Sequence, residues 1–329
     1  MRILILGGTA FLSAEIARQA VGAGHQVTCL ARGTATGPPE GSAWLRADRS
    51  LGADAYTAVT GEWDAVIDVA RDPAQAKDSL MALAARAEHW TFVSSCSVYA
   101  DHSTPGAAED AGLLPPLEKG TDFAPENYGE AKSAIEQSTA EFAGDKAHLC
   151  RAGLIGGPGD ATDRYGYWPA RFARGGDPVL LPDIPHHATQ IIDVRDLAAW
   201  ILTAAEQRTT GPLNALGDVV PFGDYVDESR RRAGNLAPVV PASEEWLVDH
   251  GAGYWAGPDS LPLWLPPGHE GFSARSNSAA KTAGMILRPW QETLRDTLGD
   301  ERHRGLGRER KAGLSPATEA RLIGELAAG

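Results

Sequence analysis

The sequence predicts an α/β protein with a doubly wound parallel sheet and a smaller C-terminal substrate lobe. Short apolar runs and amphipathic helical stretches alternate through the first two-thirds of the chain, a rhythm typical of right-handed crossovers between parallel strands. The runs are apolar at consecutive positions, as in strands that are buried on both faces of a sheet. Beyond about residue 156 the rhythm loosens, which indicates a separate and less regular lobe.

Six strands are expected in the regular part of the chain. They are Arg2–Leu6, Gln26–Leu30, Ala43–Arg46, Trp63–Asp68, Trp90–Ser94 and His148–Ala152. Helices are expected between them, at Phe11–Ala23, Ala74–Ala87 and Tyr128–Ala143. Two later strands, Gln190–Val194 and Asn214–Leu216, flank a helix at Val194–Gln207. We expect these later elements to return the chain to the first domain.

This pattern divides the chain into segments. Residues 1–155 form the first domain, to which residues 189–217 return, and residues 156–188 and 218–300 form the substrate lobe. The stretch from Pro221 to Pro267 is rich in Pro and Trp, which suits an irregular lobe over a ligand cleft. Residues 301–329 form a C-terminal extension. Its charged start, Glu301–Lys311, predicts a solvated linker, and Ser315-Pro316 predicts the cap and first residue of a terminal helix.

Composition excludes several classes of protein. The chain has 329 residues, of which 43% are hydrophobic, and this is enough for a sizeable core. The net charge of −13 disfavours general nucleic-acid binding, because an acidic surface repels phosphate backbones. Three cysteines give no disulfide framework and no metal-ligand spacing. The adjacent His186 and His187 lack an acid or cysteine at ligand spacing, so no metal is expected.

The expected location is the cytoplasm. Sparse and unpaired cysteines fit a reducing compartment. The apolar start of the chain is too short for a signal peptide, and Gly7, Gly8 and Glu15 interrupt it. No window approaches the apolar length of a membrane-spanning helix.

A glycine-containing turn follows the first expected strand and opens the first helix. A dinucleotide site needs a tight turn, close approach of the backbone to a pyrophosphate, and a helix N-terminus aimed at it. Gly7 can supply the turn. Ala10 and Ser13 stand where a G-x-x-G-x-x-G pattern has its later glycines, and both are small. The position of the turn at the start of the chain predicts a nucleotide cofactor.

Arg32 and Asp48, which follow the second and third expected strands, are candidates to bind the adenosine half of such a cofactor. An NAD site usually has a carboxylate after the second strand, whereas this chain has Ala31-Arg32-Gly33. Arg32 is suited to a 2′-phosphate, which favours NADP over the alternative, NAD. After the third strand, Asp48 is a candidate acceptor for the adenine amine or, alternatively, the cap of a turn.

Hydroxyl groups and a lysine form the candidate catalytic set. Ser95 lies at the end of an expected strand, where the ligand crevice of a doubly wound sheet opens. Tyr128 and Lys132 share one helix face at a spacing of i and i+4. A nearby ammonium favours the phenolate of a tyrosine whose free pKa is about 10. Tyr128 can then exchange a proton with a carbonyl or hydroxyl oxygen that Ser95 polarises, while Lys132 also holds the cofactor ribose.

Candidate substrate-binding residues are less specific. Cys96 and Ser97 follow Ser95 directly. Tyr165, Tyr167 and Trp168 follow the sixth strand, where the second lobe begins. Their rings could stack on a sugar or planar ligand, or simply pack the lobe.

Together these residues resemble the short-chain dehydrogenase/reductase superfamily, in particular its extended branch, the NAD-dependent epimerase/dehydratase family. The motifs GGTAFL, SSCSVYA, ENYGEAK and QIIDVRDLA stand in the order of that branch, and the resemblance covers Met1 to about Leu298. It implies a Rossmann domain with a substrate lobe, often as a homodimer. It also implies roles for particular residues. Those of the nucleotide turn are Gly7, Thr9, Phe11 and Leu12, the adenine-side acid is Asp48, and the catalytic set is Ser95, Tyr128 and Lys132.

The sequence departs from the family pattern in ways that bear on substrate. Ala10, which we include in the cofactor site, and Ser13 replace two glycines. Cys96 and Ser97 occupy the places where the dehydratases carry an acid pair, so 4,6-dehydratase activity is not expected. Ala152 replaces a usual proline, and Asp193 stands where many sugar-nucleotide members have histidine, which weakens the expectation of a nucleotide-sugar substrate.

We therefore expect an NAD(P)-dependent oxidoreductase that transfers a hydride between nicotinamide and a carbonyl or secondary alcohol, with Tyr128 as the acid/base. One alternative is a sugar or nucleotide-sugar epimerase that retains its cofactor. Another is a non-catalytic cofactor-sensing protein, against which the full catalytic set argues. The expected partner is a small-molecule substrate, without nucleic acid or membrane.

Overall fold

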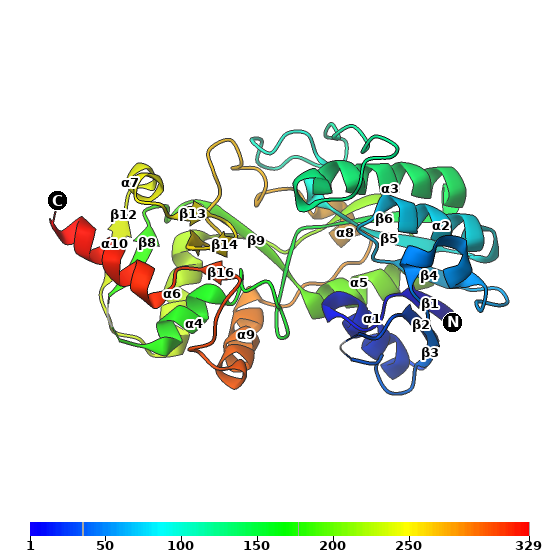
Figure 1. Cartoon of the computed structure of the whole chain (residues 1–329), viewed down its shortest axis with the longest axis horizontal. Coiled ribbons are helices and arrows are strands. Elements are labelled where there is room, and N and C mark those ends of the chain that lie inside the picture. Colours follow the sequence, from blue (N-terminus) through cyan, green and yellow to red (C-terminus); the bar gives the residue numbers. More distant parts are fainter. Residues whose placement is uncertain (35, 177, 329) are drawn as a thin grey trace.

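The chain folds into two lobes that lie side by side, with its two ends at opposite extremes of the molecule (Figure 1). The structure is a computed structural model, and it describes residues 1–34, 36–176 and 178–328. In the described residues no helix is both long and apolar enough to cross a membrane.

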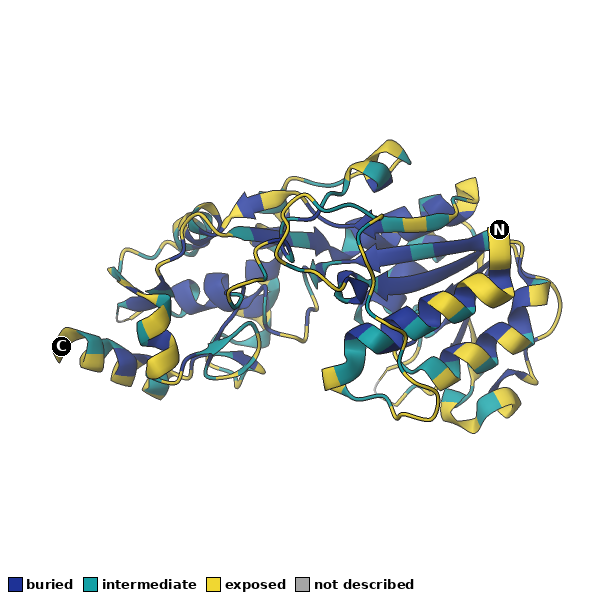
Figure 2. Cartoon of the chain, turned by 90° about the horizontal axis from the view of Figure 1, so that it is seen from above, coloured by how far each residue is buried: buried dark blue, intermediate teal, exposed yellow. Residues whose placement is uncertain are grey.

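The first lobe is built on one parallel sheet of seven strands, ordered β10-β6-β5-β4-β1-β2-β3. The strands are β1 (Arg2–Leu6), β2 (Gln26–Ala31), β3 (Ala43–Arg46), β4 (Ala65–Asp68), β5 (Trp90–Ser95), β6 (Ala147–Ala152) and β10 (Gly211–Ala215). Its central strands are buried, as consecutive apolar residues require (Figure 2). The predicted fold class is confirmed.

Helices cover both faces of this sheet. On one face lie α1 (Phe11–Gly22) and α5 (Val194–Gln207), which pack against each other. On the other face lie α2 (Pro73–Leu83) and α3 (Tyr128–Ala143), which are also in contact (Figure 1). The outer sides of these helices are exposed (Figure 2). Short 3₁₀ turns occupy Arg49–Tyr56, Ala84–Arg86, Cys96–Val98, Pro125–Asn127 and Gly144–Lys146.

The order of the strands reverses at β1. From β1 the chain adds β2 and β3 on one side, then crosses to β4, β5 and β6 on the other. Ligands of doubly wound sheets bind beyond the carboxyl ends of the strands at this switch point. The ends of β1, β4 and β5 are therefore where a site is expected.

The second lobe is less regular, with short strands and helices around an aromatic core that includes Trp168, Phe222 and Trp264. Its strands are β7 (Leu154–Gly156), β8 (Val179–Pro182), β9 (Ala188–Asp193), β11 (Val219–Pro221), β12 (Val239–Ala242), β13 (Gly253–Tyr254), β14 (Gly257–Pro258), β15 (Ser260–Leu261) and β16 (Ala312–Gly313). Its helices are α4 (Tyr167–Arg174), α6 (Phe222–Ala233), α7 (Glu244–Asp249), α9 (Trp290–Arg304) and α10 (Pro316–Ala328). The short α8 (Ser278–Thr282) packs on β10 of the first lobe.

Two late strands differ from the sequence prediction. Strand β10 begins at Gly211 and not at the predicted Asn214, so it includes Pro212. Proline is tolerated there since β10 is an edge strand, where a missing amide need not break a ladder. Strand β9 pairs with β7 and β11 instead of joining the main sheet.

The charged segment at residues 301–311 was predicted to be a solvated linker, and this holds only in part. Its exposed residues are Arg302, His303, Gly307, Glu309 and Lys311, whereas its first residue is buried. Glu301 is only 1% exposed and pairs with Arg304, Arg308 and Arg310 at 3.2, 3.0 and 2.7 Å. The buried Asp163 also pairs with Arg308. The sequence shows these charged residues, but it does not show that Glu301 is buried or that Asp163, from the loop before α4, joins the same cluster. The predicted cap of the last helix is confirmed, since the amide of Thr318 donates to Ser315 Oγ at 3.0 Å.

Candidate active site

The candidate catalytic residues converge at the carboxyl end of β5. Ser95 is the last residue of that strand, and Tyr128 is the first residue of α3. A short turn at Pro125–Asn127 leads into α3, and the side chain of Asn127 accepts a hydrogen bond from the amide of Ala124 at 2.9 Å. This turn fixes the direction in which α3 starts and thus where the Tyr128 phenol lies.

Burial and nearby polar groups act on the acidity of the Tyr128 phenol in opposite directions. Burial raises the pKa of Tyr128 above its usual value, while the Ser95 hydroxyl and the positive charges of Arg71 and Arg164 lower it. The Ser95 hydroxyl is itself oriented by Ser97, whose amide donates to Ser95 Oγ at 3.1 Å.

Lys132 lies one helical turn beyond Tyr128 and is fully enclosed, with 3% of its surface exposed. Its ammonium donates to the carbonyl oxygens of Ala70 and Val93, each at 2.7 Å, and lies 5.7 Å from the centre of the Tyr128 ring. An ammonium has three N–H groups, so one donor is left for a ligand. Burial lowers the pKa of Lys132 to about 7.

These three side chains line one pocket with a volume of about 560 Å³. The start of α1, the loop after β4 and the aromatic ring of Phe123 form other walls of this pocket. The lining residues are Ala10, Phe11, Leu12, Ser13, Arg49, Val69, Ala70, Arg71, Asp72, Gln75, Val93, Ser94, Ser95, Phe123, Tyr128, Lys132, Ala152, Gly153 and Ile155.

A second pocket, with a volume of about 300 Å³, adjoins the first and shares Ala10, Arg49 and Gln75 with it. Its walls include predicted cofactor residues Gly7, Thr9, Arg32 and Asp48. The predicted cofactor residues therefore fall into two groups: the adenosine-side residues line the smaller pocket, and Phe11, Leu12 and Lys132 line the larger one. Two connected pockets around one glycine turn match the elongated shape of a dinucleotide.

The glycine turn itself fits a pyrophosphate. Helix α1 starts after Ala10 with no side-chain cap and no acidic residue in its first turn, so its first amide groups are free for an anion. Gly7 and Gly8 have φ values of 142° and 98°, which favour glycine. A Cβ at Gly8 would also lie 2.3 Å from the Cys29 sulfur. These residues would hold the phosphates of a nicotinamide dinucleotide.

The adenosine-side candidates lie together but do not bind each other tightly. The Arg32 side chain is 63% exposed, and its guanidinium is 4.0 Å from the Asp48 carboxylate. Asp48 caps the following turn by accepting from the amide and hydroxyl of Ser50 at 3.0 and 2.8 Å. Both functions predicted for Asp48 are compatible, because it caps the turn and also lines the pocket.

Cys96 and Ser97 do not line the pocket. Cys96 is 1% exposed, and burial raises the pKa of its thiol to about 12, so the thiol is neutral. Ser97 instead supports Ser95. The structure thus gives these residues a place behind Ser95 rather than beside a substrate.

The aromatic cluster at the start of the second lobe is also placed differently from the substrate prediction. Tyr165, Tyr167 and Trp168 are at most 2% exposed and belong to the core of that lobe. The indole of Trp168 donates to the carbonyl of Pro262 at 2.8 Å. The packing alternative, which the sequence left open, describes these three residues.

Three pocket residues escaped the sequence analysis. Arg71 follows β4, and Phe123 lies 6.5 Å from the Tyr128 ring in an edge-on contact. Arg49 lines both pockets while it binds Asp68 through two hydrogen bonds of 2.7 and 2.9 Å. Arg49 and Arg71 both follow strands of the sheet, and this position was the available signal.

Comparison with known families agrees with this geometry. The sequence model described as NAD dependent epimerase/dehydratase family matches residues 3–215, which include the glycine turn and all three candidate catalytic residues. The chain belongs to this family. It is therefore an enzyme of the short-chain dehydrogenase/reductase type, from an NAD-dependent family. No protein of curated function matches the sequence.

Solved structures share the fold of this epimerase/dehydratase family member. A putative epimerase from Burkholderia cenocepacia superposes with a TM-score of 0.70 at 20% identity, covering 92% of this chain and 98% of that one. UDP-glucuronic acid 4-epimerase from Bacillus cereus, in complex with NAD, gives 0.67 at 14% identity, covering 92% and 99%. UDP-glucose 4-epimerase from Thermus thermophilus, also with NAD, gives 0.62 at 18%, covering 92% and 99%.

Proposed function

We propose that this enzyme is an NAD(P)-dependent reductase or dehydrogenase that acts on a carbonyl or secondary alcohol. The observation that supports this most is that Ser95, Tyr128 and Lys132 line the same pocket, next to a glycine turn with a free helix N-terminus. A pocket with one phenol, one hydroxyl and one buried ammonium is suited to moving a proton at an oxygen atom.

Each residue has a distinct part in this chemistry. The bound nicotinamide cofactor would supply or accept the hydride. Tyr128 holds the proton that the substrate oxygen gains or loses, and Ser95 donates a hydrogen bond to the same oxygen. Lys132 stabilises the phenolate electrostatically and has one N–H free for the cofactor ribose.

We further propose NADP as the preferred cofactor. Arg32 is exposed at the rim of the adenosine-side pocket and has no closer acid than Asp48 at 4.0 Å among the described residues. A guanidinium in this place can bind a 2′-phosphate through paired hydrogen bonds. NAD is the alternative, and it is the cofactor in the solved neighbours that contain one.

An epimerase that retains its cofactor is the second candidate. It is favoured by the solved neighbours, several of which are UDP-sugar 4-epimerases. The same three residues would serve, because epimerisation removes and returns a hydride at one carbon. Cofactor that co-purifies with the protein and shows no net turnover would favour this candidate over the first.

Three further expectations, on location, oligomeric state and nucleic-acid binding, stay predictions. Cytoplasmic location, a homodimer and the lack of nucleic-acid binding follow from the sequence. Light scattering on the purified protein tests the dimer, and a gel-shift with RNA and DNA at physiological salt tests nucleic-acid binding.

The proposed function is tested with Tyr128→Phe, which removes one hydroxyl. We expect NADH and NADPH binding, followed by fluorescence, to stay within about threefold of wild type, while turnover of a carbonyl panel falls by a factor of about 100 or more. Tyr254→Phe removes a hydroxyl outside the pocket and is the control. Full activity of Tyr128→Phe, or absence of cofactor binding by the wild-type protein, would refute the proposal.

A further inference from the structure

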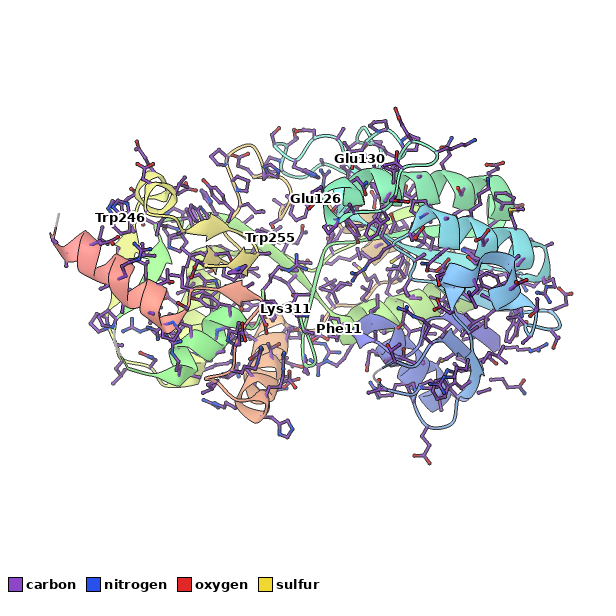
Figure 3. All side chains as sticks on the ribbon, in the orientation of Figure 1. Phe11, Glu126, Glu130, Trp246, Trp255 and Lys311 are labelled. Carbon is purple, nitrogen blue, oxygen red and sulfur yellow. The ribbon has the colours of Figure 1, made fainter. Side chains whose placement is uncertain are left out.

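Three side chains of α3 with chemical groups lie on the same side of this helix: Tyr128, Lys132 and Glu136. They are spaced by four residues, which places them one above the other. Glu136 is only 4% exposed and does not line either pocket, so its part in the site is not contact with a ligand. Glu130 of the same helix, in contrast, lies on the side away from the sheet (Figure 3). The proposed chemistry so far leaves the buried carboxylate of Glu136 without a role.

Both oxygens of the Glu136 carboxylate are hydrogen-bonded to the sheet. Oε1 accepts from the Ser94 hydroxyl at 2.6 Å and from Arg151 Nε at 3.0 Å, and Oε2 accepts from Arg151 Nη2 at 2.8 Å. Ser94 and Arg151 are each 3% exposed. Paired bonds from a guanidinium fix the plane of a carboxylate as well as its distance. Glu136 therefore ties α3 to strands β5 and β6 in one geometry.

The tied positions are next to the candidate catalytic hydroxyl. Ser94 directly precedes Ser95 on β5, and it pairs in register with Arg151 on β6. Lys132 donates to the carbonyl oxygen of Val93, the residue before Ser94. Helix α3 is therefore attached to β5 at two successive residues, immediately before the end of the strand. The distance from Ser95 to the phenol at the start of α3 depends on these attachments.

The start of α3 has little room to move against the turn that follows Ser95. A Cβ at Gly129, the residue after Tyr128, would lie 2.5 Å from the carbonyl oxygen of Ser97. Such a close approach of helix and backbone requires glycine. A small shift of the helix would therefore disturb this contact and move the phenol. The attachments further along α3 prevent that shift.

Arg151 extends the same constraint to the loop after β5. Its Nη1 donates to Tyr99 Oη and to the carbonyl oxygen of Glu109, each at 3.0 Å. This loop connects the strand that carries Ser95 with the helix that carries Tyr128. The buried ion pair thus acts on the helix directly and on the loop that precedes it.

Stability alone does not explain a buried ion pair at this place. Replacing such a pair by apolar residues of similar volume is often neutral or stabilising, because both ions are desolvated, whereas removing one partner is costly. Apolar residues do not reproduce the fixed direction of charge-assisted hydrogen bonds. This difference separates a positioning function from a purely structural one.

We propose that Glu136 is a positioning residue, whose bonds to the sheet hold the Tyr128 phenol at the distance from Ser95 that proton transfer requires. This inference rests on the proposed function, in which the phenol and the hydroxyl act on the same substrate oxygen. A misplacement of about 1 Å can lower a rate by about 100-fold. Loss of Glu136 should therefore affect the chemical step and not the binding of ligands.

The kinetic test compares Glu136→Gln and Ser94→Ala with a double variant that combines Glu136→Met and Arg151→Met. The double variant replaces the ion pair by apolar side chains of similar volume. Glu141→Gln, at an exposed glutamate of the same helix, is the control. Steady-state kinetics on the best substrate of the carbonyl panel give kcat and KM. Fluorescence titration gives the affinities for NADH and NADPH, and urea unfolding gives the midpoint.

We expect kcat to fall about 10- to 100-fold in Glu136→Gln and in the double variant, and by a smaller factor in Ser94→Ala. KM and both cofactor dissociation constants should stay within about threefold of wild type, and Glu141→Gln should match wild type. The double variant should have a higher urea midpoint than Glu136→Gln and yet the same low kcat. Recovery of kcat together with the midpoint would show a structural role and overturn the proposal.

A second measurement needs no substrate. The chain has seven tyrosines, and labelling their Cζ atoms with ¹³C gives an NMR signal for each phenol, of which Tyr128→Phe identifies one. We expect the Tyr128 signal to move in Glu136→Gln and in the double variant, and to stay unchanged in Glu141→Gln. The Tyr99 signal should also move, because its hydroxyl binds Arg151. An unmoved Tyr128 signal in Glu136→Gln would overturn the proposal.

The two measurements separate this inference from the proposed function. If wild type binds no nicotinamide cofactor, or if Tyr128→Phe keeps full activity, the proposed function fails, and the NMR signal still shows whether Glu136 sets the position of the phenol. If turnover depends on Tyr128 but Glu136→Gln is as active as wild type, this inference fails while the proposed function stands.

Discussion

Lys132 donates a hydrogen bond of 2.7 Å to the carbonyl oxygen of Val93, so a buried ammonium joins helix α3 to strand β5 two residues before Ser95, a candidate catalytic residue. A second bond of equal length reaches Ala70 after β4. The lysine therefore fixes the relative positions of the two elements that carry Ser95 and Tyr128. It does so as a buried cation, which has consequences for stability.

Lys132→Met is predicted to change the pH dependence of stability. Burial lowers the Lys132 pKa to about 7 in the folded protein, against about 10.4 in an unfolded chain. Below pH 7 both states carry the charge, and the folded state bears the full desolvation penalty. Between about pH 7 and 10.4 the unfolded state binds more protons, so wild-type stability rises with pH from this group.

The methionine variant lacks this titration. We compare the free energies of unfolding of the variant and of wild type at each pH. The difference should favour the variant most below pH 7, and it should shift toward wild type by about 3–5 kcal/mol as pH approaches 10.4. Lost hydrogen bonds add a constant offset only. Urea unfolding between pH 6 and 9.5 measures the trend, with Lys119→Met, at an exposed lysine, as control. A difference that does not vary with pH would contradict the burial of a charged amine.

The sequence predicted the fold well where periodicity and strand propensity agree. Strands β1 and β3 and helices α3 and α5 have the predicted bounds. The start of strand β10 was predicted too late in the chain, because a proline such as Pro212 argues against a strand. A single sequence does not show that this strand lies at an edge, where proline is tolerated. The second lobe has strands as short as two residues, which are too short to produce a periodic pattern.

Only part of the candidate site was predicted, because only some of its residues lie near strand and helix ends that the sequence reveals. Ser95, Tyr128 and Lys132 lie near identifiable ends of strands and helices, so their convergence follows from topology. Tyr165 and Tyr167 are aromatic, and the sequence alone does not distinguish an aromatic residue of the core from one that faces a ligand.

Ser95→Ala is predicted to reduce catalysis without affecting cofactor affinity. The substitution removes a hydroxyl that lowers the pKa of Tyr128 and that would polarise the substrate oxygen. We expect kcat/KM to fall about 100-fold, and Ser95→Thr, which keeps the hydroxyl, to recover most of it. Steady-state kinetics on the best substrate measure both variants. A loss of less than threefold in Ser95→Ala would remove this residue from the catalytic set.

Arg32→Ala is predicted to weaken NADPH binding about tenfold and NADH binding less than twofold, because only NADPH has a 2′-phosphate. Fluorescence titration of both cofactors measures the two dissociation constants. Arg18→Ala, at an exposed arginine of α1 that pairs with Glu15, is the control for a general loss of positive charge. Equal losses for the two cofactors would show that Arg32 does not select NADP.

Glu301→Gln is predicted to destabilise the second lobe. Glu301 is almost fully buried and neutralises Arg304, Arg308 and Arg310, while Asp163 shares the same cluster. Removing one acid leaves partly buried guanidinium groups with Asp163 as their remaining counter-charge, so we expect a loss of about 1–3 kcal/mol, below that for a fully buried pair. The expected result is a lower urea midpoint for unfolding of the chain.

Glu309→Gln provides the matched control, because Glu309 lies in the same segment but is exposed. Its free energy of unfolding should stay within about 0.5 kcal/mol of wild type. The Glu301→Gln loss should also persist at high salt, since buried pairs are screened far less than surface pairs. Equal stability of the two variants would mean that the segment is solvated, as its composition suggested, and that the buried cluster contributes nothing to the fold.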